Sequence, residues 1–236
     1  MDWSPFFISM KTAVLSTVIT FFLGIYAAQK VVRADSRFSW IVDGLLTLPL
    51  VLPPTVAGFF LLVLFGRKGI VGGFLSEIGL EVVFTWKAAV IAAVVISFPL
   101  MYRSARGAFE QVDRNLIYAG RTLGMSEAKI FWKVIMPLAL PGVASGGILS
   151  FARALGEFGA TLMIAGNIPK LTQTMPVAIY MAVQGSKMGE AALWVAVIVL
   201  IAFLSVSLIN LFAEAGRKYM RRGNADEFLR RDRKEI

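Results

Sequence analysis

Arg153 and Glu157 carry opposite charges within an apolar stretch, Leu138–Ala165, where they could pair with each other or act on an anion. Their separation of four residues places both on one face of a helix. A charge near the centre of a bilayer costs about 2.5–3.5 kcal/mol, so each charge needs a partner or water. Two interpretations stay open. The pair neutralises itself and fixes helix packing, or Arg153 faces a pathway and lowers the barrier for an anion.

Covalent chemistry has few candidates in this sequence. The chain has no histidine and no cysteine, so the commonest metal ligand, the commonest general base and all thiolate chemistry are absent. It also has no G-x4-G-K-[ST] string, which ATP-binding phosphate loops use. A series of intramembrane acids and histidines, as in many proton-coupled transporters, is missing too. We expect no catalytic residue, no metal site and no cofactor in this chain.

The elements that must position these side chains are membrane spans. Hydrophobic residues make up 57% of the 236 residues and charged residues 17%, and the mean hydropathy is +0.72. About twenty apolar residues cross a bilayer core of roughly 30 Å. Runs of this kind predict an all-α integral membrane protein with five long spans, near Ile8–Gln29, Ile41–Phe65, Thr85–Tyr102, Leu138–Ala165 and Ala191–Ala213.

The basic residues predict how these spans are oriented. Seventeen of the 24 lysines and arginines lie in segments 30–37, 102–137 and 214–236, and short cytoplasmic loops carry an excess of such residues. Five crossings that start outside put all three segments, and the C-terminus, in the cytoplasm. A sixth crossing by the shorter apolar stretch 171–183 would move the basic tail outside. We therefore expect a re-entrant or interfacial helix there, a single transmembrane domain over 1–222 and a basic cytoplasmic tail over 223–236.

Prolines interrupt two of the expected spans. Pro49, Pro53 and Pro54 lie in the second span, and Pro99 lies in the third. Each proline removes a backbone donor and disfavours a straight helix, which lipid tolerates only where neighbours or water satisfy the freed carbonyl groups. These residues are candidates for a fixed kink that shapes the bundle, or for a hinge and gate near the outer side.

The central segment 107–137 is polar and basic between apolar spans. Asp113 and Ser126 are each placed to cap a short helix, and Gly124 is placed to end the first helix in a left-handed conformation. The expected helices are Arg114–Leu123 and Glu127–Ile135, the second ending at Pro137, where the next span begins. Two short helices joined by a glycine would form a compact knob in the cytoplasm. The alternative is an ordinary amphipathic loop on the membrane surface.

The segment resembles a known motif. Tyr118-Ala119-Gly120, then Gly124, then Val134-x-Met136-Pro137 is similar to the EAA motif of ABC importer permeases, E-A-A-x3-G-x9-I-x-L-P. Tyr118 replaces the acid, and small or apolar residues replace the alanine, isoleucine and leucine. In that family the motif forms a coupling helix that docks into a groove of a cytoplasmic ATPase. The resemblance assigns this coupling role to Tyr118, Ala119, Gly120, Leu123, Gly124, Met125 and Pro137.

The resemblance extends over residues 15–211. The strings at 48–66, 97–113, 151–161 and 166–180 resemble molybdate permease subunits of ABC transporters. FARALGEFGA at 151–160 also resembles sulfate permeases, so it indicates oxyanions as a group. The run GNIPKLTQTMPVAIY at 166–180 favours molybdate, with tungstate as a companion.

This family implies a fold and a set of partners. The fold would be a type I ABC importer permease bundle. The partners would be a second copy of the chain, a cytoplasmic ATPase dimer that holds ATP and magnesium, an extracytoplasmic molybdate- or tungstate-binding protein and membrane lipid, with no nucleic acid. The alternatives are a sulfate permease of the same family, a secondary anion transporter or channel that needs no ATPase, and a membrane scaffold.

Overall fold

The computed structural model describes residues 2–33 and 39–232, with side chains described up to residue 211. These residues form helices and connecting segments without a strand, which confirms the all-α prediction. The helices are α1 (Ser4–Arg33), α2 (Ser39–Val51), α3 (Pro54–Phe65), α4 (Ile70–Glu77), α5 (Trp86–Glu110), α6 (Arg114–Thr122), α7 (Glu127–Ile130), the π-helical turn η1 (Phe131–Ile135), α8 (Met136–Leu155), α9 (Gly159–Ala165), α10 (Met175–Gln184) and α11 (Met188–Asp232).

Four of the described helices are long and apolar enough to cross a membrane, and α2 with α3 would make a fifth crossing if the bent pair counts as one. The four are α1, α5, the continuous helix 127–155 and the part of α11 over 188–211. The helix α10 has only ten residues. At 1.5 Å per residue it is about 15 Å long, which is half of the roughly 30 Å that a crossing needs.

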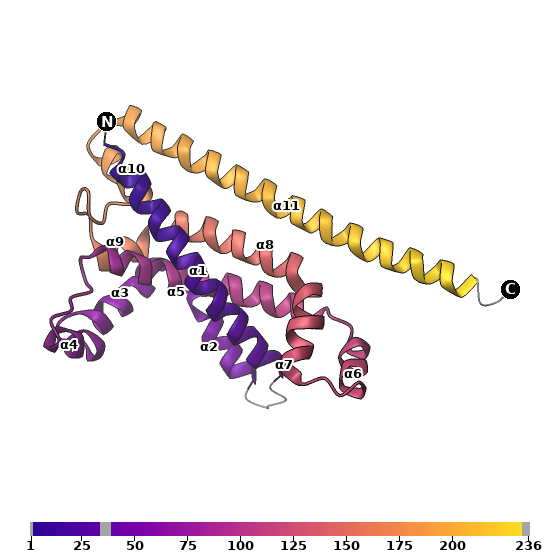
Figure 1. Ribbon diagram of the computed structural model, residues 1–236. Coiled ribbons are helices and arrows are strands. Elements are labelled where there is room, and N and C mark those ends of the chain that lie inside the picture. Colours follow the sequence, from indigo (N-terminus) through magenta and orange to yellow (C-terminus); the bar gives the residue numbers. More distant parts are fainter. Residues whose placement is uncertain (1, 34–38, 233–236) are drawn as a thin grey trace.

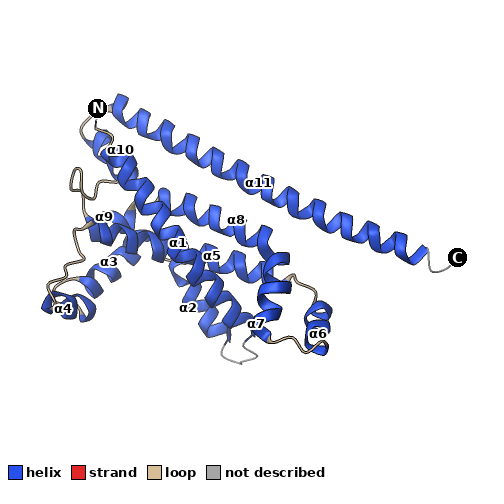
Figure 2. Cartoon of the chain, viewed as in Figure 1, coloured by secondary structure: helices blue, strands red, loops and turns tan. Residues whose placement is uncertain are grey.

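The long helices α1, α5 and α8 lie side by side and form the bundle (Figure 1). At one end lie α3, α4, α9, α10 and the N-terminus, and at the opposite end lie α6 and α7 (Figure 2). Small residues bring α8 close to α5. A Cβ atom added to Gly146 would lie 2.5 Å from the Cβ atom of Ser104, and one added to Gly142 would lie 2.8 Å from that of Ala108. This pair of glycines therefore packs within the subunit.

The second expected span is broken rather than straight. α2 and α3 meet at an angle of 110°, and the break falls at Pro53, which has φ −53° and ψ 134°. A proline disfavours the helical conformation of the residue before it, so Pro54 forces Pro53 out of the helix and then begins α3, where a proline fits. Pro49 and Pro99 were expected as breaks too. The helices α2 and α5 continue through them. An interior proline disfavours a helix, but packing of α5 along α1 and α8 holds that helix together.

The fourth span also differs from the expectation of one helix over 138–165. α8 ends at Leu155 and α9 begins at Gly159. Glu157 lies between the two helices, where its carboxylate accepts a hydrogen bond from the backbone N–H of Ala160 at 2.8 Å. That bond satisfies a donor at the start of α9 and stabilises the break.

The sequence suggested that the second helix of the central segment ends at Pro137. The structure shows that it does not. It runs on through η1 into α8, and the helix is continuous over 127–155. In η1 the N–H of Met136 donates to the carbonyl oxygen of Phe131, five residues back. This wider turn carries the chain past the proline without a break.

The last expected span, 191–213, lies within α11. This helix shows no interruption at residue 222, where the expected tail begins, and it continues to Asp232. Residues 233–236 of the expected tail lie outside the described residues.

Candidate functional site

Both short helices of the central segment begin at the residues expected to cap them. The Asp113 carboxylate accepts from the backbone N–H of Asn115 at 2.9 Å, at the start of α6. The Ser126 hydroxyl accepts from the backbone N–H of Lys129 at 3.4 Å, at the start of α7. Each cap satisfies a donor that a helix start otherwise leaves unpaired.

Gly124 ends α6 in the expected left-handed conformation, with φ +73°. The N–H of Met125 donates to the carbonyl oxygen of Gly120 at 3.0 Å, and the N–H of Gly124 donates to that of Arg121 at 2.9 Å. These two bonds make a Schellman motif, which ends a helix sharply and favours glycine at the left-handed position. The chain therefore turns directly from α6 into α7.

The corner between α6 and α7 is closely packed. Gly120 is buried, and a Cβ atom added to it would lie 3.1 Å from the Cγ1 atom of Ile130 in α7. Across the turn, Nε of Arg121 lies 2.7 Å from Oε1 of Glu127. This hydrogen bond raises the pKa of the Arg121 guanidinium. We call the unit formed by α6, α7 and η1 (residues 113–135) the knob.

The knob is fixed to the ends of α1 and α5. Arg33, at the end of α1, donates from Nη2 to the backbone carbonyl of Glu127 at 3.1 Å, and its guanidinium lies 5.8 Å from the ring centre of Phe131. Phe131 is buried and packs edge-on against Phe109 of α5, with ring centres 5.5 Å apart. A displacement of the knob therefore acts on α1, α5 and α8 together.

The outer surface of the knob exposes large apolar side chains on a basic segment. Leu123 is 80% exposed, Trp132 64%, Tyr118 52% and Leu116 45%. Exposed apolar side chains of this size within a basic segment are typical of a surface that binds another protein. The residues assigned to coupling from the motif did not include Trp132 or Leu116, although a tryptophan within a polar basic segment already indicates a contact surface.

The residues that the motif assigned to coupling divide into two groups. Gly120 is buried in the corner and Met125 is half-buried beside it, so both shape the knob from within. The exposed ones are Tyr118, Ala119, Leu123, Gly124 and Pro137. Pro137 lies in the first turn of α8, away from the corner in sequence.

Arg153 and Glu157 form the ion pair that their spacing suggested. Nη1 of Arg153 lies 2.8 Å from Oε2 of Glu157, and the Glu157 side chain is 1% exposed against 31% for that of Arg153. The other carboxylate oxygen accepts from Ala160 at the start of α9. Each carboxylate oxygen of Glu157 thus has a partner, and the side chain ties the end of α8 to the beginning of α9.

The break between α8 and α9 packs against the break between α2 and α3. A Cβ atom added to Gly159 would lie 3.1 Å from the Cβ atom of Pro54, and one added to Gly58 would lie 2.7 Å from the Cα atom of Ala160. Only glycine permits such close approach of two backbones. We call this contact, made by residues 53–58 and 156–160, the helix-break junction. It is at the end of the bundle opposite the knob (Figure 1).

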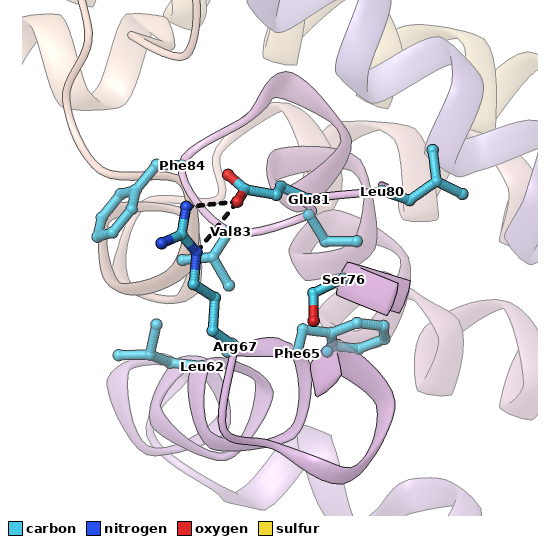
Figure 3. Close-up of a pocket in the computed structure, with 11 residues that line it drawn as sticks. Leu62, Phe65, Arg67, Ser76, Leu80, Glu81, Val83 and Phe84 are labelled. Atoms are coloured by element: carbon cyan, nitrogen blue, oxygen red, sulfur yellow. Dashed lines mark hydrogen bonds and ion pairs between the residues drawn. The ribbon is translucent and has the colours of Figure 1, made fainter. Parts of the chain in front are cut away.

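A cavity of about 350 Å³ lies between the end of α3, α4 and residues 80–84 (Figure 3). Arg67 and Glu81 point toward one another across it, with Nη2 and Oε1 2.5 Å apart. They are the charged residues among those that line it. Because they neutralise each other, the cavity offers little net attraction to an anion.

One polar cluster was not expected from the sequence. Oδ1 of Asp43 in α2 accepts from the Tyr102 hydroxyl at 2.7 Å and from the Arg106 guanidinium. Nε of Arg106 also donates to Glu110 at 2.7 Å. Asp43 and Arg106 are 63 residues apart in the chain, so their spacing carries no signal. The position of Asp43 within an expected span could have indicated this cluster, since acidic residues are rare inside a membrane and need a partner.

Comparison with known proteins places the chain among transport subunits. Residues 20–223 match a protein family described as binding-protein-dependent transport system inner membrane component. The molybdenum transport system permease protein ModB of Escherichia coli K12 is 42% identical over 211 residues, which cover 88% of this chain and 91% of that protein. The ModB protein of Haemophilus influenzae is 38% identical over 227 residues, which cover 95% of this chain and 99% of that protein.

Two further similarities are more distant. A relative named for sulfate transport, from Chlorokybus atmophyticus, is 33% identical over 209 residues, which cover 89% of this chain and 71% of that protein. Among solved structures, an inward-facing conformation of the MetNI methionine ABC transporter matches with a TM-score of 0.63 and 19% identity, and covers 92% of this chain and 94% of that one. At this level of identity, the similarity to MetNI shows only that the two chains share a fold.

Proposed function

This chain belongs to the family of inner membrane components of binding-protein-dependent transport systems, and we propose that it is the permease subunit of an ATP-driven importer of molybdate. It is a transport subunit and not itself an enzyme. The observation that carries the proposal is the knob, a capped and rigid protrusion with exposed apolar side chains, joined without interruption to a long apolar helix. Such a protrusion suits docking to a soluble partner that supplies energy from ATP.

The substrate class is a tetrahedral oxyanion, with molybdate first and tungstate as its companion. Relatives named for molybdenum transport share 38–44% identity over most of the chain, against 33% for the relative named for sulfate. These values support molybdate above the sulfate alternative. Arg153 is paired with Glu157, so the neutral pair suits a permease whose external binding protein holds the ion tightly.

We assign a different partner to each end of the bundle. We place the N-terminus, α4, α9 and α10 outside, where the molybdate- or tungstate-binding protein docks, and the knob and the C-terminus in the cytoplasm. α2 and α3 then make one broken crossing among five, and α10 is a re-entrant or interfacial helix. Residues 1–222 form the transmembrane domain and residues 223–236 its basic extension. Two copies of the chain, surrounded by lipid, enclose the pathway.

An ATPase dimer in the cytoplasm binds ATP with magnesium and receives the knob in a groove. Tyr118 in α6 and Leu123, directly after α6, offer highly exposed apolar side chains for this contact. Because the helix from Glu127 to Leu155 is continuous, a pull on the knob moves α8 along its whole length. The far end of α8 is tied through Glu157 to the helix-break junction. We place the outer gate there, at Pro53 and Pro54.

The test is reconstitution with a partner ATPase. The chain is co-purified with candidate ATPases, placed in lipid vesicles and supplied with a binding protein loaded with molybdate, tungstate or sulfate. We expect molybdate to stimulate ATP hydrolysis and to enter the vesicles. Stronger stimulation by sulfate would favour the sulfate permease. Ion uptake without any ATPase complex would favour a secondary transporter.

Gly124→Val is expected to reduce stimulated ATP hydrolysis and uptake by about tenfold or more. The cause is the backbone, since a Cβ atom at this position meets no atom within 4 Å, whereas the left-handed conformation costs an L residue roughly 1–2 kcal/mol. Gly124→Asn is the matched control, because asparagine tolerates this conformation, and it should retain most activity. Equal activity of the two variants would show that the sharp end of α6 is not required.

Gly120→Leu is expected to weaken binding of the ATPase while the bundle stays intact. The new side chain would push against Ile130, 3.1 Å from its first carbon, and separate α6 from α7. Co-purification of the ATPase at increasing salt measures the loss, and a thermal unfolding scan of the permease alone checks the bundle. Undiminished binding of the ATPase would mean that its affinity does not depend on how α6 packs against α7.

A further inference from the structure

The cluster of Asp43, Tyr102, Arg106 and Glu110 joins α2 to α5, and we call it the α2–α5 joint. Oδ1 of Asp43 accepts from the Tyr102 hydroxyl at 2.7 Å and from Nη1 of Arg106. The guanidinium of Arg106 reaches Glu110 as well, at 2.7 Å from Nε to Oε1. The Asp43 and Arg106 side chains are 28% and 31% exposed. One carboxylate thus binds two donors from a helix that is distant in sequence.

The joint is the principal polar attachment of α2 in the described chain. None of the α2 residues, 39–51, is buried, and within the bundle α2 packs chiefly on α5. Apolar burial therefore contributes little to fixing α2. A charged pair with its hydrogen bonds satisfied on both sides is the stronger and more directional contact.

The joint also has a particular place along the two helices. Tyr102, Arg106 and Glu110 follow at intervals of four and so share one face of α5. Glu110 is the last residue of α5, close to the start of α6 at Arg114. Asp43 lies about one turn from the start of α2, whose other end is the break at Pro53. The joint thus connects the knob end of α5 to the helix that leads to the helix-break junction.

We propose that Asp43, Tyr102 and Arg106 are positioning residues for transport, which make α2 move with α5 when the knob is displaced. The proposal rests on the permease function proposed above. In this arrangement the knob acts on the junction by two routes, through α8 to Glu157 and through α5 and α2 to Pro53. If the second route is broken, ATP hydrolysis continues, but displacement of the knob no longer moves α2 and the gate at the break between α2 and α3.

The test compares the ions imported with the ATP consumed. Asp43→Leu removes the joint but leaves Arg106 paired with Glu110, so no charge loses its only partner. In vesicles with the ATPase and a molybdate-loaded binding protein, we expect ATP hydrolysis within about twofold of the native rate. The molybdate imported per ATP should fall about fivefold or more, a size within the range of coupling energies along packed networks. A role in folding alone would instead lower ATP hydrolysis and molybdate uptake by the same factor and leave the molybdate imported per ATP unchanged.

Two further variants sharpen the outcome. Asp43→Glu keeps the charge and should restore more than half of the ratio, and Leu45→Ala, at a 65% exposed position of α2, should leave it unchanged. If Asp43→Leu does not assemble, Tyr102→Phe removes a single hydroxyl and should still lower the ratio. A native ratio in Asp43→Leu, or in Tyr102→Phe where that replaces it, overturns the proposal. Failure of the native chain to bind an ATPase or import molybdate would instead refute the permease function.

Discussion

Replacing Glu157 by alanine is expected to lower the stability of the folded chain by about 3 kcal/mol, the lower end of the range for a buried ion pair, because its carboxylate is buried while Arg153 is partly exposed. The Glu157 side chain is 1% exposed and binds both Arg153 and the N–H of Ala160. Its loss leaves a guanidinium without its partner in an apolar segment and removes the cap of α9. The apparent melting temperature in detergent should fall on the order of 10 °C.

Glu81→Ala is the matched control for this loss. Glu81 also pairs with an arginine, Arg67, but the two side chains are 56% and 79% exposed, and exposed pairs contribute roughly 0–1 kcal/mol. If the two variants are equally stable, burial does not determine the strength of the Glu157 pair.

The double variant Arg153→Ala with Glu157→Ala separates the two roles of the pair. If the pair is structural, removing both charges should restore much of the stability and the transport lost in either single variant. If Arg153 also lowers the barrier for the oxyanion, the double variant should be stable but transport poorly. Molybdate uptake, measured beside thermal unfolding, distinguishes these results.

Gly58→Leu is expected to reduce molybdate uptake by more than tenfold, the largest effect on transport among these predictions. A Cβ atom at Gly58 would already lie 2.7 Å from the Cα atom of Ala160 and 2.9 Å from the Cβ atom of Met163. Backbone atoms cannot give way as a flexible side chain can, so α3 must separate from α9. Overpacking of this kind typically costs 1–3 kcal/mol or more, and it opens the contact at which we place the gate.

The Gly58 variant should still bind the ATPase, since the junction and the knob lie at opposite ends of the bundle. Gly189→Leu is the control substitution, because a Cβ atom at Gly189 meets no atom within 4 Å. It should import molybdate at the native rate. Native uptake by Gly58→Leu would show that close contact of α3 with α9 is not needed for the gate.

Local features were accessible from the sequence because they depend on neighbouring residues. Asp113, Gly124 and Ser126 specify the start of α6, its end and the start of α7, and each acts through backbone groups within four residues. The apolar runs likewise identify the long helices, since the length needed to cross a bilayer is a property of one segment. The resemblance over residues 15–211 identified the family before any geometry was known.

The class of the protein, the approximate positions of its apolar segments and the shape of the knob corner could therefore be predicted from the sequence alone. The packing of the helices established which proline breaks a helix and which does not, how Glu157 holds the start of α9, and how α2 attaches to α5. These outcomes depend on contacts between distant segments, such as Gly58 with Ala160 and Asp43 with Arg106. Their strength comes from burial and close packing, and neither quantity exists until the helices have come together.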